Sequence, residues 1–189
     1  MLKRLLLLAL CGVLLLSFAA CGEETPDEDT PQDATQETYT ETYVPNETVN
    51  RFLVTLKERN GYQSLSIEKG NGENEYVVFL NGCSVSLSPS AYGLGAVITA
   101  EPGKESLERL MAVFGHLTQT ADKSCTKEQL DEAITRMKQL PAECIGYRVG
   151  NEVKILNFQP SVQVGGSATD HRLDLLLMNY TYHPEAEEE

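Results

Sequence analysis

The sequence has no tryptophan, only five cysteines, and 15 lysines and arginines against 28 aspartates and glutamates. With few bases and no basic stripe, the chain has nothing to neutralise a row of phosphates, so nucleic acid is not expected as a partner. Sugar-binding platforms usually use tryptophan, so its absence weakens a carbohydrate-binding interpretation. No two cysteines have the Cys-x-x-Cys spacing, which argues against a zinc cluster.

The sequence also lacks the short motifs that accompany common enzyme chemistries. It contains no Gly-x-Ser-x-Gly elbow, phosphate-binding loop, dinucleotide fingerprint, His-Glu-x-x-His or EF-hand pattern. The stretch 93–95, Gly-Leu-Gly, is too short to cradle a phosphate and precedes a predicted strand. We therefore expect no metal, no cofactor and no catalytic residue.

Long hydrophobic runs are absent except at the N-terminus. Lys3 and Arg4 precede an almost wholly apolar run at 5–16, which is followed by small residues and then by Cys21. This order is typical of a secretory signal. The apolar run is shorter than the ~20 residues of a transmembrane helix. Residues 1–20 are therefore predicted to be a signal peptide.

Phe18-Ala19-Ala20-Cys21 resembles the bacterial lipobox, with phenylalanine where leucine is usual. The resemblance implies that the Cys21 thiol is diacylglycerylated and that cleavage makes Cys21 the first mature residue. Two acyl chains anchor a protein stably. The resemblance thus implies a lipoprotein of the cell membrane that faces the extracytoplasmic side. The alternative is an ordinary secretory signal followed by an unmodified cysteine.

Acidic residues gather at both ends of the mature chain. Residues 22–45 hold eight acids, no base and almost no apolar side chain, so they cannot bury enough surface to offset chain entropy. We predict a lipidated, disordered tether at 21–45, a single folded domain at 46–184 and an acidic tail at 185–189. The charge of the tether and tail keeps such segments extended and soluble.

Apolar spacing in 46–184 predicts a helix, four strands, two helices and four further strands. Asn46 and Gly61 are expected to bound the first helix, and Thr126 with Gln129 forms a capping box for the third. The fold class is therefore α+β, a largely antiparallel sheet with helices on one face. The two strand runs suggest related repeats. Their element order is similar to that of beta-lactamase-inhibitor-type domains. The strands are expected near 63–68, 76–80, 83–88, 96–100, 144–149, 153–158, 161–164 and 172–182.

Small hydroxyl side chains are expected on the solvent face of the first strand run. Covering such side chains costs little conformational entropy. A possible interaction face therefore consists of Ser64, Ser66, Ser84, Ser86 and Ser88. We expect a non-catalytic domain that binds an extracytoplasmic protein or a cell-wall component. The alternative is an ordinary exposed sheet face.

Two other functions remain as alternatives. In a small-molecule carrier, the sheet would curl around an apolar pocket. In a hydrolase, Cys125 before a helix N-terminus or His171 beside Asp170 would supply the reactive group. Otherwise Cys83, Cys125 and Cys144 are small apolar residues, and the sequence leaves open whether two of them form a disulfide. His116 is expected on the solvated face of its helix, and His183 near the tail.

Overall fold

The computed structural model describes residues 38–39, 44–160, 163–164, 167–168 and 171–181. These residues belong to one compact unit, Gln36–Glu189. The predicted signal peptide, most of the predicted tether and the acidic tail lie outside the described residues, as do Cys21 and His183.

The described residues form three α-helices, one short 3-10 helix and ten strands. The helices are α2 (Glu47–Asn60), α3 (Ser106–Ala121), α4 (Lys127–Gln139) and the 3-10 helix η1 (Pro141–Cys144). The first five strands are β1 (Thr38–Tyr39), β2 (Ser66–Lys69), β3 (Tyr76–Leu80), β4 (Cys83–Ser90) and β5 (Gly93–Ala100). The others are β6 (Arg148–Val149), β7 (Val153–Gln159), β8 (Gln163–Val164), β9 (Ser167–Ala168) and β10 (Arg172–Leu177).

The expected signals bound two of the helices. The Asn46 side chain accepts a hydrogen bond from the Val49 N–H at 3.1 Å, and α2 ends at Gly61, whose φ of +69° favours glycine. At α4, the Thr126 hydroxyl accepts from the Gln129 N–H, and the Gln129 side chain accepts from the Thr126 N–H. Both predicted caps are confirmed.

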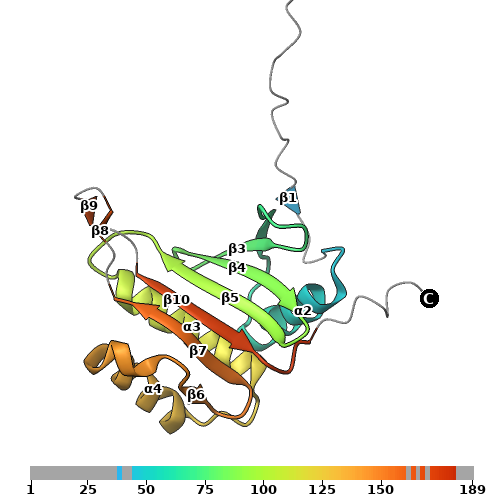
Figure 1. The fold of residues 1–189 in the computed structure, drawn as a ribbon. Helices are drawn as coiled ribbons and strands as arrows, with labels where there is room; N and C mark the ends of the chain where they lie inside the picture. Colours follow the sequence, from blue (N-terminus) through green and yellow to red (C-terminus); the bar gives the residue numbers. More distant parts are fainter. Residues whose placement is uncertain (1–37, 40–43, 161–162, 165–166, 169–170, 182–189) are drawn as a thin grey trace, which may run out of the picture. The chain divides into compact units, whose positions relative to one another are not determined.

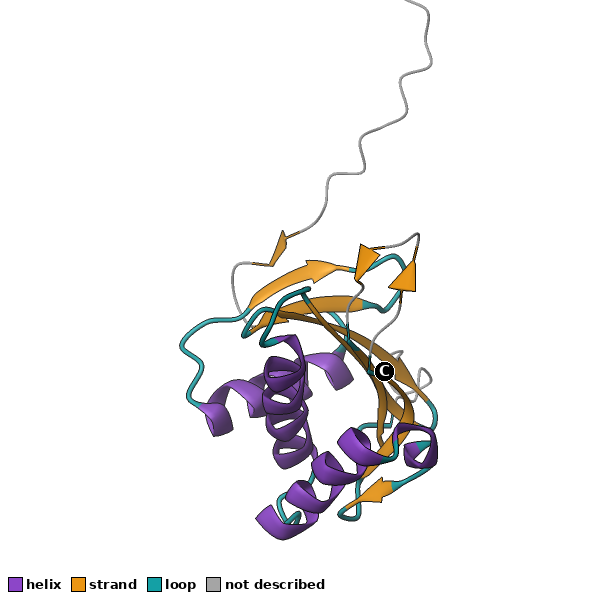
Figure 2. Ribbon diagram, turned by 90° about the vertical axis from the view of Figure 1, so that its left-hand side faces the viewer, coloured by secondary structure: helices purple, strands orange, loops and turns teal. Residues whose placement is uncertain are grey.

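The main sheet has the strand order β1-β2-β3-β4-β5-β10-β7-β6, and every neighbouring pair is antiparallel (Figure 1). The Asn81-Gly82 turn joins β3 to β4 and sets Val78 opposite Val85. The three helices lie on one side of a strongly curved sheet (Figure 2). The predicted class, α+β with a largely antiparallel sheet and helices on one face, is confirmed.

The core lies between the sheet and α3. On the helix side, Leu110, Phe114 and Leu117 are completely buried. On the sheet side, Val85 and Ile98 are completely buried as well. Each such side chain contributes about 1.5–3 kcal/mol when it is removed from water. This alternation of buried and outward side chains turns the other face of the sheet toward solvent.

The second strand run differs from the prediction. Residues 144–149 were expected to form one strand, but Pro141 begins the 3-10 helix η1, and only Arg148–Val149 pair with β7. The expected strand at 161–164 is reduced to β8, which pairs with β9 in a separate two-stranded sheet. The last strand, β10, ends at Leu177 because the chain turns there and Tyr180 packs edge-on against Phe52, with ring centroids 5.1 Å apart.

The domain also begins earlier than residue 46. Val44 is completely buried, and Thr38–Tyr39 pair with Ile67 and Glu68 of β2. Residue spacing alone did not reveal this, because the segment 22–45 is polar apart from a few isolated side chains. The strand expected at 63–68 corresponds to β2, which is shorter and spans Ser66–Lys69.

Candidate functional site

One candidate site is the outer face of the sheet, which we define as the outward side chains of β2, β3, β4, β5, β10 and β7. The strand register aligns two rows of such side chains across these six strands. One row is Ser66, Phe79, Ser84, Thr99, Arg172 and Gln159, and the next is Glu68, Val77, Ser86, Val97, Asp174 and Asn157. Arg172 Nε and Asp174 Oδ1 lie 2.9 Å apart and form an ion pair.

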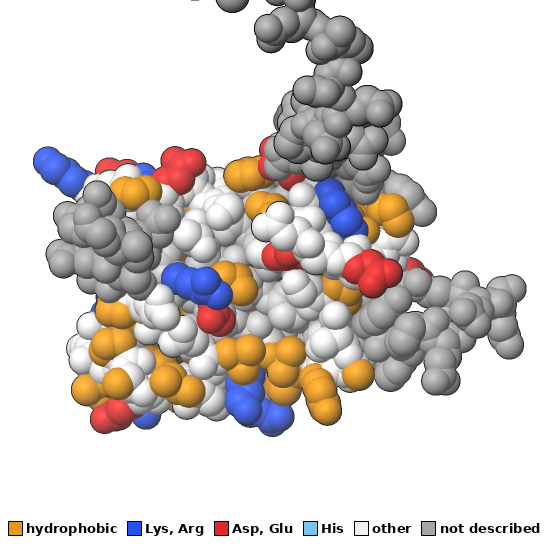
Figure 3. Space-filling model, turned by 45° about the horizontal axis from the view of Figure 1, so that its top comes forward, with side chains coloured by type: hydrophobic (Ala, Val, Ile, Leu, Met, Phe, Trp, Pro, Cys, Tyr) orange, Lys and Arg blue, Asp and Glu red, His pale blue; other side chains and the backbone are white. Residues whose placement is uncertain are grey.

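The outer face is weakly charged. Figure 3 shows this side of the molecule, where uncharged and apolar surface covers most of the area between scattered basic and acidic side chains. Phe79 of β3 is 44 % exposed on this face, between Ser66 and Ser84, although it is a large apolar residue. The serines of β4 alternate with buried Cys83, Val85 and Leu87. An exposed aromatic ring surrounded by small side chains is a surface that a partner can cover at low entropic cost.

Four of the five serines proposed for an interaction face lie on the outer face. Ser66, Ser84, Ser86 and Ser88 point outward from β2 and β4. Ser64 is exposed but precedes β2. The sequence therefore predicted the outward direction of these four serines, because the period-two pattern of β4 is regular, but it did not indicate the outward residues of β3, β5, β7 and β10.

A feature that the sequence analysis missed is the carboxylate of Glu75, which folds onto the outer face. Its Oε1 accepts a hydrogen bond from the Ser86 hydroxyl, and its Oε2 accepts from the Gly72 N–H at 2.9 Å. The Ser86 and Gly72 hydrogen bonds lower the pKa of the Glu75 carboxyl. Ser86 is therefore already partnered, whereas no Glu75 bond restrains Ser84.

A second candidate site is a polar pocket of about 560 Å³. It lies between α2, the C-terminal end of α3, the residues that follow α3, the turn before β7 and the chain after β10. Six charged residues line it: Arg51, Glu58, Arg59, Asp122, Lys123 and Glu152. Because these residues come from three separate segments of the chain, no local sequence motif marked the pocket.

The Asp122 side chain connects separate segments of the chain that line the pocket. It is only 4 % exposed, and its oxygens accept from the Ser124 N–H at 2.8 Å, the Ser124 hydroxyl at 2.6 Å, the Asn151 N–H at 2.6 Å and the Glu152 N–H at 3.3 Å. Burial raises the pKa of the Asp122 carboxyl, but these hydrogen bonds outweigh burial and leave its pKa below the ordinary value. This carboxylate therefore joins the end of α3 to the β6–β7 turn.

The position of His116 in its helix predicted a solvated side chain, but the side chain is only partly exposed, because it packs against Tyr62. Its Nδ1 lies 2.5 Å from the Tyr62 hydroxyl, and the two rings meet edge-to-face with centroids 5.7 Å apart. Burial lowers the pKa of the His116 imidazole. The prediction failed because α2 and the residues after it cover a second face of α3.

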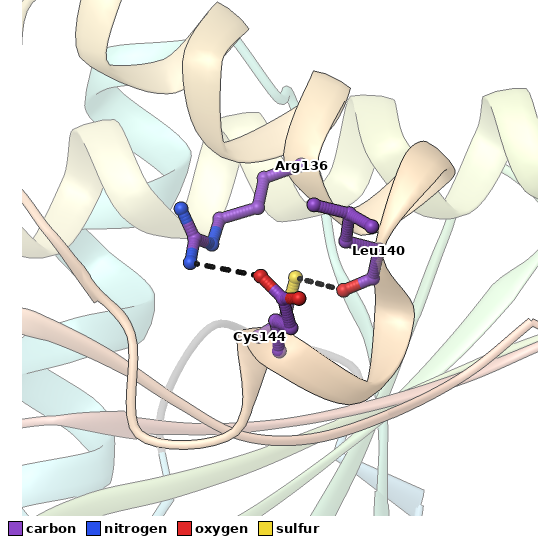
Figure 4. A network of polar contacts seen from close by, with 4 residues as sticks. Arg136, Leu140 and Cys144 are labelled. Carbon is purple, nitrogen blue, oxygen red and sulfur yellow. Dashed lines mark hydrogen bonds and ion pairs between the residues drawn. The ribbon is translucent and has the colours of Figure 1, made fainter.

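The cysteines of the described region are free thiols. Cys83 and Cys144 are buried, as expected for small apolar residues, and no disulfide joins them or Cys125. Burial raises the pKa of the Cys83 thiol to about 11. The Cys144 thiol donates to the Leu140 carbonyl oxygen at 3.5 Å, beside the ion pair of Arg136 and Glu143 (Figure 4).

The geometry does not activate the thiol proposed for a hydrolase. Burial and then the negative charge of Asp122 raise the pKa of the Cys125 thiol, whereas a nucleophile needs a lowered pKa. The position of Cys125 before α4 is therefore not accompanied by the lowered thiol pKa that was expected there. His171 lies at the start of β10, where its carbonyl oxygen accepts from the Ala100 N–H, and Asp170 lies outside the described residues.

The concave side of the sheet is the place where a carrier would hold its ligand. Leu110, Phe114 and Leu117 of α3 occupy that side and are completely buried.

Within the described residues, no group of three or more His, Cys, Asp or Glu side chains is placed to hold a metal ion. In the same part of the chain, no helix has both the length and the apolar character needed to cross a bilayer. Comparison of the chain with protein families, curated proteins and solved structures finds no match.

Proposed function

We propose that this chain is an extracytoplasmic lipoprotein, anchored through Cys21, whose domain binds a protein or a cell-wall component with the outer face of its sheet. The observation that carries the proposal is the uneven covering of the sheet. Within the part of the chain that the structure describes, all three helices lie on one side of the sheet, and no helix covers the other side across six strands. On this face Phe79 is 44 % exposed, and Val77 and Val97 are half-buried, so a partner would find apolar area to cover.

The composition of the outer face favours a macromolecular partner. Ser84, Thr99 and Val97 have short side chains that lose little freedom when covered. The Arg172–Asp174 pair is already neutralised within the face. A partner that covers this surface would therefore displace water from small groups without breaking many charged contacts.

The anchor is tested by Cys21→Ser. Because the thiol accepts the lipid, the variant should be released from the membrane or remain unprocessed, whereas the parent should fractionate with membranes. Cell fractionation with mass analysis of the N-terminus measures both outcomes. A correctly cleaved variant that still fractionates with membranes would show that Cys21 does not carry the anchor.

The docking surface is tested by Ser84→Arg in the full-length protein. A long cation at the centre of the outer face should weaken partner recovery at least tenfold, since it must be desolvated under the partner. Ala112→Arg is the matched control, because Ala112 is an exposed residue of α3. Crosslinking in living cells, followed by co-purification, compares the two variants with the parent. Equal recovery with both variants would exclude this face.

The carrier and the hydrolase remain alternative proposals with separate tests. A carrier would need an apolar ligand in the volume now occupied by Phe114, so tight binding of an apolar probe would favour it. A hydrolase would need Cys125 or His171, so loss of an identified hydrolytic activity on replacing either residue by alanine would favour it. Retention of that activity in both variants would end the hydrolase proposal.

We also infer that the two strand runs descend from one repeated unit. Each run follows a helix, and the final strands of the two runs, β5 and β10, pair with each other inside the sheet. Superposition of the two halves should align α2 with α4 and β5 with β10. If other elements align better, the two halves are not repeats.

A further inference from the structure

We propose that the polar pocket beside Asp122 binds a small zwitterion, namely an amino acid or short peptide with a free ammonium group and a free carboxylate. This site is separate from the outer face of the sheet. Its occupant is inferred from the charges of the pocket, four of which form no ion pair with a described residue, and from the size of the hollow.

The spacing of side chains on α2 forms one wall of the pocket. Arg51, Thr55 and Arg59 follow one another at intervals of four residues and therefore lie on one face of the helix. Thr55, the middle residue, is short, and its hydroxyl donates to the Arg51 carbonyl oxygen at 2.9 Å. A short side chain between two long ones leaves a hollow on the helix surface.

The end of α3 forms the opposite wall, and its backbone is already capped. Arg59 Nη1 donates to the carbonyl oxygens of Gln119 at 2.7 Å and Thr120 at 2.8 Å. Asn179 donates to the Ala121 carbonyl oxygen at 2.6 Å. These bonds satisfy carbonyl groups that a helix end leaves open. This wall of the pocket is therefore preformed in the absence of a ligand.

Two of the six charged residues of the pocket already form hydrogen bonds with other groups of the protein. Arg59 bonds to the end of α3, and Asp122 accepts from four donors. The other four are two bases and two acids: Arg51, Lys123, Glu58 and Glu152. The ion pairs found among the described residues are Arg136–Glu143 and Arg172–Asp174, so these four charges do not pair with one another.

Arg51 is the group best placed to take a carboxylate. Its guanidinium lies over the Tyr180 ring, with Cζ 5.3 Å from the ring centroid. Tyr180 is in turn fixed, because it is 6 % exposed and packs edge-on against Phe52. A guanidinium held over an aromatic ring keeps its N–H groups available for bidentate bonds to a carboxylate.

The acids Glu58 and Glu152 favour a cation elsewhere in the same hollow. Glu152 lines the pocket and has its N–H bound to Asp122, which restrains its backbone. The end of α3 contributes no free negative charge, because the Arg59 cation already bonds to its carbonyl oxygens. Charges of both signs in a pocket of about 560 Å³ suit a ligand that carries both, and the volume is in the range of small-molecule sites.

The test is a titration of the purified full-length protein in detergent with the dipeptide alanyl-alanine, followed by ligand-observed NMR. Binding should weaken about tenfold or more when the dipeptide is N-acetylated or C-amidated, because each blocked end removes a charge-assisted hydrogen bond. Arg51→Gln and Glu152→Gln should weaken binding of the unblocked dipeptide to a similar extent. Lys104→Gln, at an exposed base outside the pocket, should leave it unchanged.

Several results would overturn the proposal: no binding at millimolar dipeptide, equal binding of the blocked peptides, or the same loss in Lys104→Gln as in Arg51→Gln. Lys123→Gln serves as a second pocket variant if Arg51→Gln lowers the thermal midpoint. Ser84→Arg should leave dipeptide binding intact, so failure of the docking proposal and failure of the pocket proposal give different results.

Discussion

Gly93→Ala is expected to lower the free energy of unfolding by about 3 kcal/mol or more. A Cβ on Gly93 would lie 2.5 Å from the Leu177 carbonyl oxygen and 3.0 Å from the Met178 Cα. Both are backbone atoms at the end of β10, so the strand itself would have to move. Gly93 also has a φ of +140°, a conformation that residues with a Cβ rarely adopt. Urea melts of the purified protein measure the loss.

Gly61→Ala is the matched control for Gly93→Ala. Gly61 also has a positive φ, +69°, but an added Cβ would meet no atom within 4 Å. The control should therefore lose only the backbone cost of about 1 kcal/mol. The difference between the two variants combines the steric contact between β5 and β10 with the higher backbone cost of a side chain at the φ of Gly93. If both variants lose the same free energy, the close approach of Gly93 to β10 is wrong.

Asp122→Ala is expected to cost about 3 kcal/mol at neutral pH. The variant leaves four donors without their acceptor: the N–H groups of Ser124, Asn151 and Glu152, and the Ser124 hydroxyl. Asp131→Ala, which removes an exposed carboxylate of α4, should change stability by less than ~0.5 kcal/mol. Thermal or urea melts compare the two. Equal stability of both variants would contradict the role assigned to Asp122.

The cost of Asp122→Ala should also depend on pH. The pKa of the folded Asp122 carboxyl is below its ordinary value of 3.8. The stabilisation is therefore complete above pH 3.8 and is lost as the pH falls through the lower, folded-state pKa. The difference in stability between the parent and Asp122→Ala should shrink on acidification below 3.8. A difference that stays constant or grows would mean that the folded pKa is not lowered.

Local patterns predicted the parts of the fold whose determinants are close in sequence. The caps at Asn46 and Thr126 bond to residues three positions away, and the alternation in β4 follows from one turn at Asn81-Gly82. These elements appeared where they were expected. The predicted strand at 144–149 failed because η1 uses Pro141 to begin a helical turn, which apolar spacing does not distinguish from a short strand.

The two candidate sites differ in the same respect: the residues of one follow a local sequence pattern, and those of the other are far apart in the sequence. The outer-face serines were found because β4 is regular, with one inward and one outward residue in turn. The pocket was not found, because Asp122 bonds to the backbone of Asn151 and Glu152, about thirty positions away. An Asp two residues before Ser124 is a local capping pattern, but it does not reveal the distant partner.

The most direct test of the account is a photo-crosslinking amino acid at Thr99 in the full-length protein, expressed in intact cells. Thr99 lies in the middle of the outer face, between Ser84 and Arg172. The same amino acid at Ala112, on the exposed side of α3, is the control. If the outer face is the docking surface, a discrete adduct forms at Thr99, is absent at Ala112 and is lost in Cys21→Ser. The same adducts at both positions, or none at Thr99, would contradict it.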